Sequence, residues 1–298
     1  MKILVLLVLG SMLTSGCSTT QITSTSGVEA ANANTAASYD ILLASDIQWG
    51  DLNPARGHNS PRAGNLWGDR ASSGATGFLV KFKDGFSSPP HIHNVTYRGL
   101  VIDGLVHNDD PGAEVMWMPP GSFWTQPAGE LHITAAKGNN NIAYIEIQQG
   151  PYLVLPSKDA FDNGQRPINM DQSNINWLDA SDIKWINQPE MPATGDGIKV
   201  AFLWGNRQIK QPNGLLVKLP AGFTGTIHSQ SKSFRAVVIQ GQLEYQSPGV
   251  PGNKTLDAGS YFGSNGNTTH HIASHAQDES TIYIRTDGKL NINASNTK

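Results

Sequence analysis

The chain has 298 residues, which is enough for one large domain or two of ordinary size. Charged residues make up 15% of it and the formal net charge is −3, so it lacks the basic character of nucleic-acid-binding proteins. The 31 glycines and 17 prolines favour a β-rich fold with many turns over a helical one.

The first 17 residues, MKILVLLVLGSMLTSGC, have the pattern of a secretory signal peptide. A basic start at Lys2 precedes an apolar run over residues 3–9, which is too short to cross a bilayer as a helix. The stretch LTSGC resembles the bacterial lipobox, in which a cysteine after small residues is lipidated and becomes the new N-terminus. Cys17 is the only cysteine of the chain, so a disulfide within the chain is excluded.

These features predict an extracytoplasmic protein. We expect a lipid anchor at Cys17, facing the periplasm, as the only contact with a membrane; the alternative is simple secretion with an incidental cysteine. Residues 18–40 are rich in Ser, Thr and Ala and predict a flexible tether between this anchor and the folded part.

The rest of the chain is an internal repeat. Three segments recur 137 residues later in the chain. NLWGDR at 65–70 returns as FLWGNR at 202–207, GFLVKFKDGF at 77–86 as GLLVKLPAGF at 214–223, and YRGLVIDG at 97–104 as FRAVVIQG at 234–241. Such a steady spacing indicates a duplicated domain.

Each repeat consists of short apolar or alternating runs separated by Gly, Pro and Asn, the pattern of short antiparallel strands. We therefore predict an all-β chain of two tandem jelly-roll barrels, packed face to face with exchange of a joining strand. The first barrel is expected over residues 41–156, a linker over 157–176, and the second barrel over 177–295.

Two spaced motifs in the first repeat resemble those of the cupin superfamily. The first cupin motif is Gly-x5-His-x-His-x3-Glu-x6-Gly, and here Gly85, His91, His93 and Gly104 match it, while Tyr97 takes the place of the glutamate. The resemblance implies the cupin fold, in duplicate (a bicupin), because the internal repeat extends it over most of the chain.

The second cupin motif is Gly-x5-Pro-x-Gly-x2-His-x3-Asn. Gly121, Pro127, Gly129 and His132 match it at the same spacing, and Ala136 replaces the asparagine. The resemblance is therefore specific in both motifs and departs from the family pattern at one position in each.

Three histidines of this repeat are candidate metal ligands: His91, His93 and His132. The first two are separated by one residue, so they project from the same face of a strand. Three imidazoles in a small barrel leave open positions on a divalent ion, as a catalytic site requires. Ligand type alone leaves Fe(II), Zn, Ni, Mn and Cu open.

Because Tyr97 replaces the usual carboxylate, the site is similar to that of the three-histidine cupins, which include iron dioxygenases that cleave β-diketones, hydroxyacetophenones or thiols. This similarity favours Fe(II). We expect Tyr97 or Glu146 to orient a ligand or move a proton. Glu130 and Glu146 are both candidate substitute ligands; Glu146 lies on a strand and is the one expected to face inward, whereas Glu130 on the turn is expected to face solvent. Arg98 alternates with Tyr97, and we expect it in an ion pair at the seam between the barrels, with substrate binding as the alternative role.

The second repeat carries a weaker version of the site. By the spacing of the repeat, His228 and Gln230 replace the histidine pair, Phe234 replaces Tyr97, and His270 replaces His132. Two imidazoles and an amide are poor ligands for a tight divalent site. The second barrel is expected to support the first or to keep a small-molecule pocket.

Three functions remain open at this point: a metal-dependent dioxygenase, a non-catalytic binding or sensing lipoprotein, and an isomerase or lyase acting on sugars or organic acids. Each takes a small-molecule substrate or ligand and none takes a nucleic acid. The fold alone cannot separate them, because one fold hosts many chemistries. A homo-oligomer is also left open.

Overall fold

The computed structural model describes residues 38–183, 186–187, 197–206 and 211–295. The expected signal peptide, Cys17 and most of the expected tether lie outside the described residues. The described residues belong to one compact unit. Within them, no helix has both the length and the apolar composition that crossing a membrane would need.

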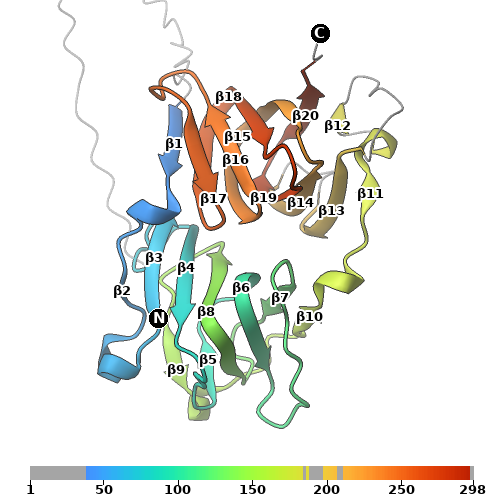
Figure 1. The fold of residues 1–298 in the computed structure, drawn as a ribbon. Helices are drawn as coiled ribbons and strands as arrows, with labels where there is room; N and C mark the ends of the chain where they lie inside the picture. Colours follow the sequence, from blue (N-terminus) through green and yellow to red (C-terminus); the bar gives the residue numbers. More distant parts are fainter. Residues whose placement is uncertain (1–37, 184–185, 188–196, 207–210, 296–298) are drawn as a thin grey trace, which may run out of the picture. The chain divides into compact units, whose positions relative to one another are not determined.

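The first barrel contains a seven-stranded antiparallel sheet with the strand order β10-β7-β6-β8-β4-β3-β2 (Figure 1). A two-stranded sheet pairs the histidine strand β5 with β9. The strands are β2 (Gly50–Asp51), β3 (Arg62–Trp67), β4 (Thr76–Phe82), β5 (His91–His93), β6 (Tyr97–Asp109), β7 (Phe123–Gln126), β8 (Ile133–Ile147), β9 (Val154–Pro156) and β10 (Ile168–Met170).

The second barrel is an eleven-stranded sheet with the central order β11-β13-β14-β19-β15-β18-β16-β17. Its strands are β1 (Ser38–Leu42), β11 (Leu178–Asp179), β12 (Ile186–Asn187), β13 (Lys199–Trp204), β14 (Asn213–Leu219), β15 (Thr224–Gln240), β16 (Gln242–Gln246), β17 (Lys254–Asp257), β18 (Tyr261–Ser274), β19 (Ser280–Thr286) and β20 (Lys289–Ala294). The predicted all-β fold of two cupin barrels is thus confirmed.

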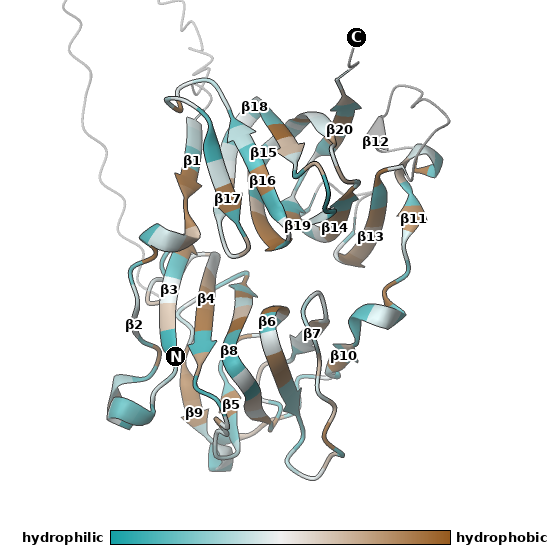
Figure 2. Cartoon of the chain, viewed as in Figure 1, coloured by the Kyte–Doolittle hydropathy of each residue, from teal (hydrophilic) through white to brown (hydrophobic). Residues whose placement is uncertain are grey.

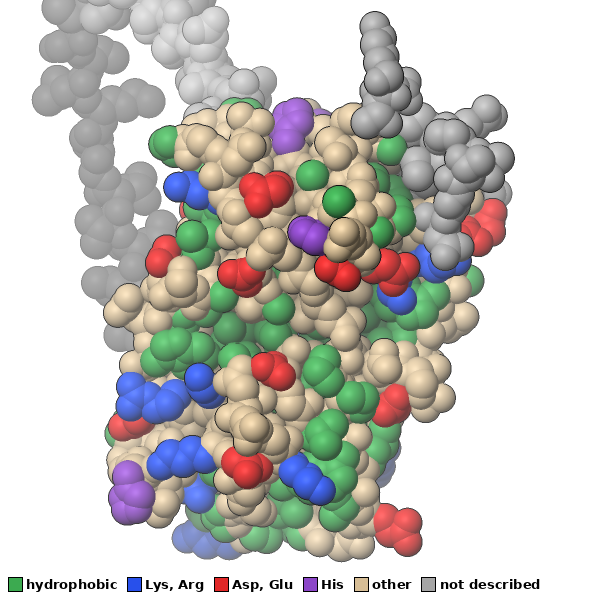
Figure 3. Space-filling model, viewed as in Figure 1, with side chains coloured by type: hydrophobic (Ala, Val, Ile, Leu, Met, Phe, Trp, Pro, Cys, Tyr) green, Lys and Arg blue, Asp and Glu red, His purple; other side chains and the backbone are tan. Residues whose placement is uncertain are grey.

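Short 3-10 helices connect the strands of both barrels: η1 (Ala44–Asp46), η2 (Pro54–Asn59), η3 (Ser157–Asp159), η4 (Gln172–Asn174) and η5 (Ala180–Asp182). In Figure 2 the η2 segment is coloured as hydrophilic, whereas strands such as β4 and β13 carry long hydrophobic stretches. Figure 3 shows Lys and Arg side chains interspersed with Asp and Glu on the visible face, so neither sign of charge dominates there.

Two segments expected to connect domains are in fact strands. β1, which includes the last residues of the expected tether, pairs with β18 of the second barrel. β10, from the expected linker, pairs with β7 of the first barrel. The first described strand therefore belongs to the second barrel, and the strands that follow it form the first barrel. This is the expected exchange of a strand between the barrels. Short edge strands like these have little periodicity of their own, since pairing with a neighbouring sheet is what makes them strands.

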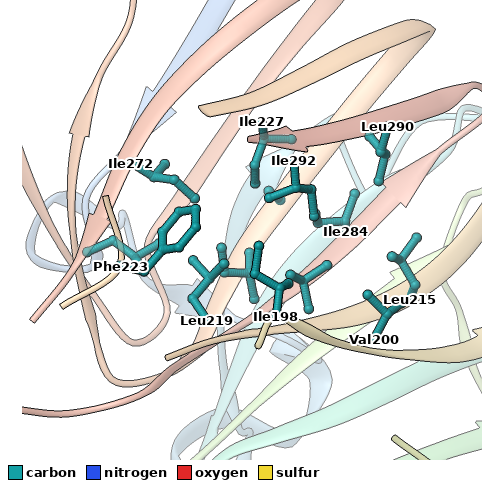
Figure 4. Close-up of a cluster of buried hydrophobic side chains, with 14 of the residues drawn as sticks. Ile198, Val200, Leu215, Leu219, Phe223, Ile227, Ile272, Ile284, Leu290 and Ile292 are labelled. Atoms are coloured by element: carbon teal, nitrogen blue, oxygen red, sulfur yellow. The ribbon is translucent and has the colours of Figure 1, made fainter. Parts of the chain in front are cut away.

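Buried hydrophobic side chains form a separate core inside each barrel. Figure 4 shows the core of the second barrel, where branched side chains such as Ile227, Ile272 and Ile292 fill the interior together with Phe223. A third core lies between the barrels and contains the same positions of both repeats, for example Leu79 with Leu216, Leu100 with Val237, Ile102 with Ile239, and Tyr144 with Tyr283. The two barrels therefore pack through equivalent faces.

Candidate metal centre

The backbone brings the two histidine motifs side by side. His91 and His132 are antiparallel neighbours, and each backbone N–H donates to the other residue's carbonyl at 3.0 Å. The N–H of Gly129 donates to the carbonyl of His93 at 2.9 Å. Gly129 has a φ of +79°, and a Cβ there would approach the carbonyl oxygen of Phe161 within 2.4 Å, so the turn before His132 requires glycine.

The three imidazoles meet in the first barrel as the sequence predicted. One nitrogen from each of His91, His93 and His132 lies within 4.8 Å of the other two, and all three side chains are buried. Nitrogens bound to one ion at about 2.1 Å can lie at most about 4.2 Å apart. Small ring rotations would therefore bring the three nitrogens around a single ion.

Backbone carbonyls fix the tautomer of all three rings. His91 Nδ1 lies 2.9 Å from the carbonyl oxygen of Pro89, His93 Nδ1 lies 2.8 Å from that of Leu153, and His132 Nδ1 lies 3.1 Å from that of Glu130. A carbonyl oxygen only accepts hydrogen bonds, so each Nδ1 carries the proton and each neutral ring has its lone pair on Nε2. This is the second-sphere arrangement that orients metal-binding histidines.

The rings are also held in the neutral form. Burial, together with the nearby His91, lowers the pKa of His132 to about 3. Burial and the two other imidazoles lower the pKa of His93 well below its usual value, and burial lowers that of His91. Metal binding requires unprotonated imidazoles, so protons compete weakly for these ligands at neutral pH.

Tyr97 points into the centre, in the place where the family has a glutamate. Its hydroxyl donates to Asn108 Oδ1 at 2.8 Å, and its oxygen lies 3.4 Å from His132 Nε2. Asn108 is in turn held by Thr134 and Gln126. Burial raises the pKa of Tyr97, so the hydroxyl keeps its proton.

A second tyrosine, Tyr152, lies at the centre and was not among the predicted site residues. Tyr152 stacks on His93, with ring centroids 4.3 Å apart, and its hydroxyl donates to His93 Nε2 at 3.1 Å. It lies just before β9 near the end of the expected first barrel, and its position depends on the pairing of β9 with the histidine strand β5. No motif marks it in the sequence.

Two of the three imidazoles, those of His91 and His93, border a cavity of about 380 Å³, a size that suits a small organic molecule. Most of its wall is apolar or aromatic. The described lining residues contain no Asp or Glu and only one side chain with a permanent charge, Arg56. The charged and aromatic lining residues include Arg56, Phe82, Phe86, His91, His93, Tyr97, Trp124 and Tyr152.

The expected inward position of Glu146 is wrong. Glu146 is fully buried, but it lies at the contact between the barrels, where the hydroxyls of Tyr144 and Tyr283 donate to its Oε2 at 3.0 and 2.9 Å. Alternation along β8 explains the difference, because Ile145 lines the cavity and its neighbour Glu146 must face the other way.

Arg285, which takes the position of Glu146 in the second repeat, faces it across this contact with Nε 3.2 Å from Oε1. Burial raises the pKa of Glu146, and Arg285 and Arg98 oppose that shift. Arg98 lies at the seam between the barrels, as expected, but it stacks 3.9 Å above the ring of Trp204 instead of forming the expected ion pair.

The second barrel arranges its related residues differently. A bulge in β15 between Ser231 and Phe234 changes the phase of the strand, so Ile227 points into the core while His228 and Gln230 point out of it. His270 is buried, and both of its ring nitrogens lie within 3.0 Å of a hydroxyl oxygen. This histidine is a core residue with satisfied hydrogen bonds.

Comparison with solved structures supports the fold. A proposed dioxygenase from Nostoc punctiforme shares 14% sequence identity over 84% of this chain and 83% of its own, with a TM-score of 0.62. Salicylate 1,2-dioxygenase from Pseudoaminobacter salicylatoxidans, in adducts with gentisate, shares 14% over 84% and 81%, with a TM-score of 0.52. Vicilin from hazelnut, Corylus avellana, shares 12% over 83% and 85%, with a TM-score of 0.51.

These structural similarities support the cupin fold and leave the reaction open, since one fold hosts unrelated functions. A search of curated protein sequences gives no match. One family matches nearly the whole folded part, residues 40–293. With its two barrels and its three converging histidines, the chain is a cupin-fold member of the family described as "Domain of unknown function (DUF4437)".

Proposed function

We propose that this protein is a metal-dependent oxidoreductase of the three-histidine dioxygenase type, with His91, His93 and His132 as the metal ligands. The observation that carries the proposal is the convergence of three buried imidazoles, each with Nδ1 at a backbone carbonyl and its lone pair therefore on Nε2. Fe(II) is our preferred ion. It would supply Lewis-acid activation of the substrate and reaction with dioxygen.

The charge of the site favours an anionic substrate. Three neutral imidazoles leave the full +2 charge of a divalent ion, and no carboxylate is found among the described residues that line the cavity. An enolate or a related bidentate anion would neutralise that charge on binding. Incorporation of both atoms of dioxygen into such a substrate needs no added reductant.

Two tyrosine hydroxyls would control protons around the substrate. Tyr152 already donates to the lone pair of His93 that a metal would take, so on metal binding its hydroxyl is free to donate to a bound ligand. Tyr97 is held by Asn108 beside His132 Nε2 and would orient a ligand next to that ring. Aromatic side chains, including Trp124, would exclude water from the reacting atoms.

The test is anaerobic purification without a histidine tag, followed by elemental analysis and oxygen uptake on a panel of β-diketones. We expect about one iron per chain and oxygen uptake with at least one substrate. Zinc without turnover would instead favour a binding module. Turnover without oxygen uptake would favour an isomerase or lyase.

We further propose that the protein works outside the cytoplasm, tethered by a lipid on Cys17. The support is the signal-like N-terminus with a lone cysteine after small residues. Cys17→Ser should move the protein from the membrane fraction to the soluble fraction. An unchanged distribution between the fractions would refute the anchor.

A further inference from the structure

One residue of the cavity has no role in the proposed metal site. Arg56 lies in η2, a segment outside both cupin motifs, and is the only permanently charged side chain among the described lining residues. The side chain of Asn53 accepts a hydrogen bond from the N–H of Ala55 at 3.2 Å and so fixes the start of η2. The cation is thus presented by a capped, ordered segment.

Within the described part of the chain, the guanidinium of Arg56 has no partner for its charge. It lies over the ring of Phe86, 5.5 Å from the centroid, and makes no ion pair or side-chain hydrogen bond with the described residues. Arg62, Arg166 and Arg285, by contrast, each pair with a carboxylate. A guanidinium offers a planar pair of N–H donors that matches a carboxylate, and the aromatic ring beneath it limits its orientation.

We propose that Arg56 is the anion-binding residue of the cavity and holds the carboxylate of a substrate whose apolar, flat body lies between η2 and the imidazoles. This inference rests on the proposed function, because the metal held by the three imidazoles defines where the other end of the substrate reacts. The cavity wall supports it, because Phe82, Phe86, Trp124 and Tyr152 give aromatic surfaces and no acidic side chain in the described lining repels an anion.

The internal repeat gives independent support. The second repeat, in which the histidine pair is lost, has INQPEMPATGDGIKVAFLW over residues 186–204, the segment that corresponds to the one containing Arg56. That segment contains no arginine. Arg56 therefore occurs together with the complete histidine set, as expected of a residue that serves the same ligand.

The test measures binding of three acids of increasing length, benzoate, phenylacetate and 3-phenylpropionate, and of their neutral amides. Calorimetry is done on the full chain, both metal-free and loaded with Zn(II). The variants are Arg56→Met and Arg56→Lys, with Arg166→Met as a control that removes the same charge from an exposed ion pair outside the cavity.

We expect the wild type to bind at least one acid more tightly than its amide. Arg56→Met should weaken acid binding by about tenfold to a hundredfold, the usual effect of a charged hydrogen bond, and leave amide binding within about twofold. Arg56→Lys should retain part of the affinity, and Arg166→Met should retain all of it.

The inference is overturned if no acid binds better than its amide, or if Arg56→Met binds the acids as tightly as the wild type. Elemental analysis measures the metal content of each variant, so failure of the anion site can be distinguished from failure of the proposed metal site. Arg56-dependent binding in a chain that never retains metal would refute the metal site alone. Retained metal with Arg56-independent binding would refute the anion site alone.

Discussion

Removal of His93 tests the metal centre most directly. Its side chain is 2% exposed, its Nδ1 is bound to the carbonyl of Leu153, and its ring stacks on Tyr152. His93→Ala therefore removes one of three ligands and also leaves a void, which by itself costs about 2–5 kcal/mol of folding free energy. The absolute melting temperature would mix these two effects, so the readout must be the change in melting temperature on addition of metal.

The expected size follows from binding linkage. Metal at a hundred times its Kd stabilises the native state by about 2.7 kcal/mol. For a chain of this size, each kcal/mol raises the melting temperature by about 2–4 °C, so Zn(II) should raise that of the wild type by about 5–10 °C. In His93→Ala, whose Kd should rise by about a hundredfold or more, the same metal concentration stabilises by at most about 0.4 kcal/mol, so the increase should fall to about 2 °C or less.

The matched control is His228→Ala, at the corresponding position of the second repeat. His228 is half-buried, points away from the core of its barrel and hydrogen-bonds through Nδ1 to Thr269 at 2.9 Å. This variant should keep the full increase with Zn(II), and a chelator should reverse it. Equal loss of the increase in both variants, or its persistence in His93→Ala, would refute the assignment of the site to the first barrel.

Three further results are expected. Tyr97→Glu should place a carboxylate beside His132 and tighten metal binding by about tenfold or more in competition with a chelator; weaker binding would contradict the inward position of Tyr97. Burial lowers the pKa of His270 to about 3. Between about pH 6.5 and 3 the unfolded state therefore binds a proton that the folded state does not, so the free energy of unfolding decreases as the pH is lowered through this range. His270→Gln should reduce this fall, measured by urea unfolding, by up to about 1.4 kcal/mol per pH unit, and an unchanged slope would show that His270 is accessible to protons. Tyr283→Phe removes a hydrogen bond to buried Glu146 and should lower the free energy of urea unfolding by about 2–4 kcal/mol with unchanged metal content; loss of metal would contradict the separation of the two sites.

The spacing of residues within the two cupin motifs, and of the two repeats along the chain, was enough to predict the barrels and the three histidines. Each cupin motif places its glycines at turns, and Gly85, Gly104, Gly121 and Gly129 all have positive φ. Between these turns, the period of a strand directs His91 to the same side as His93. These are local constraints, so they are visible in a single chain without its structure.

Other features depended on contacts between distant segments. The position of Glu146 follows from which side of β8 faces the cavity. The internal repeat held a partial signal for it, because Arg285 takes its place in the second repeat, but the packing that brings the two side chains together is tertiary. The outward position of His228 had no such signal. The bulge in β15 between Ser231 and Phe234 adds one residue, and this reverses the side of the sheet to which the residues before the bulge point.

The sequence by itself determined the duplication, the all-β fold and the three imidazoles, because the residues that specify them act through local turns and strand alternation. Only the tertiary structure decided that Tyr152 and Arg56 join the same cavity and that Glu146 leaves it. Those positions depend on strand pairing and barrel packing between segments far apart in the chain, and no short-range pattern encodes that pairing.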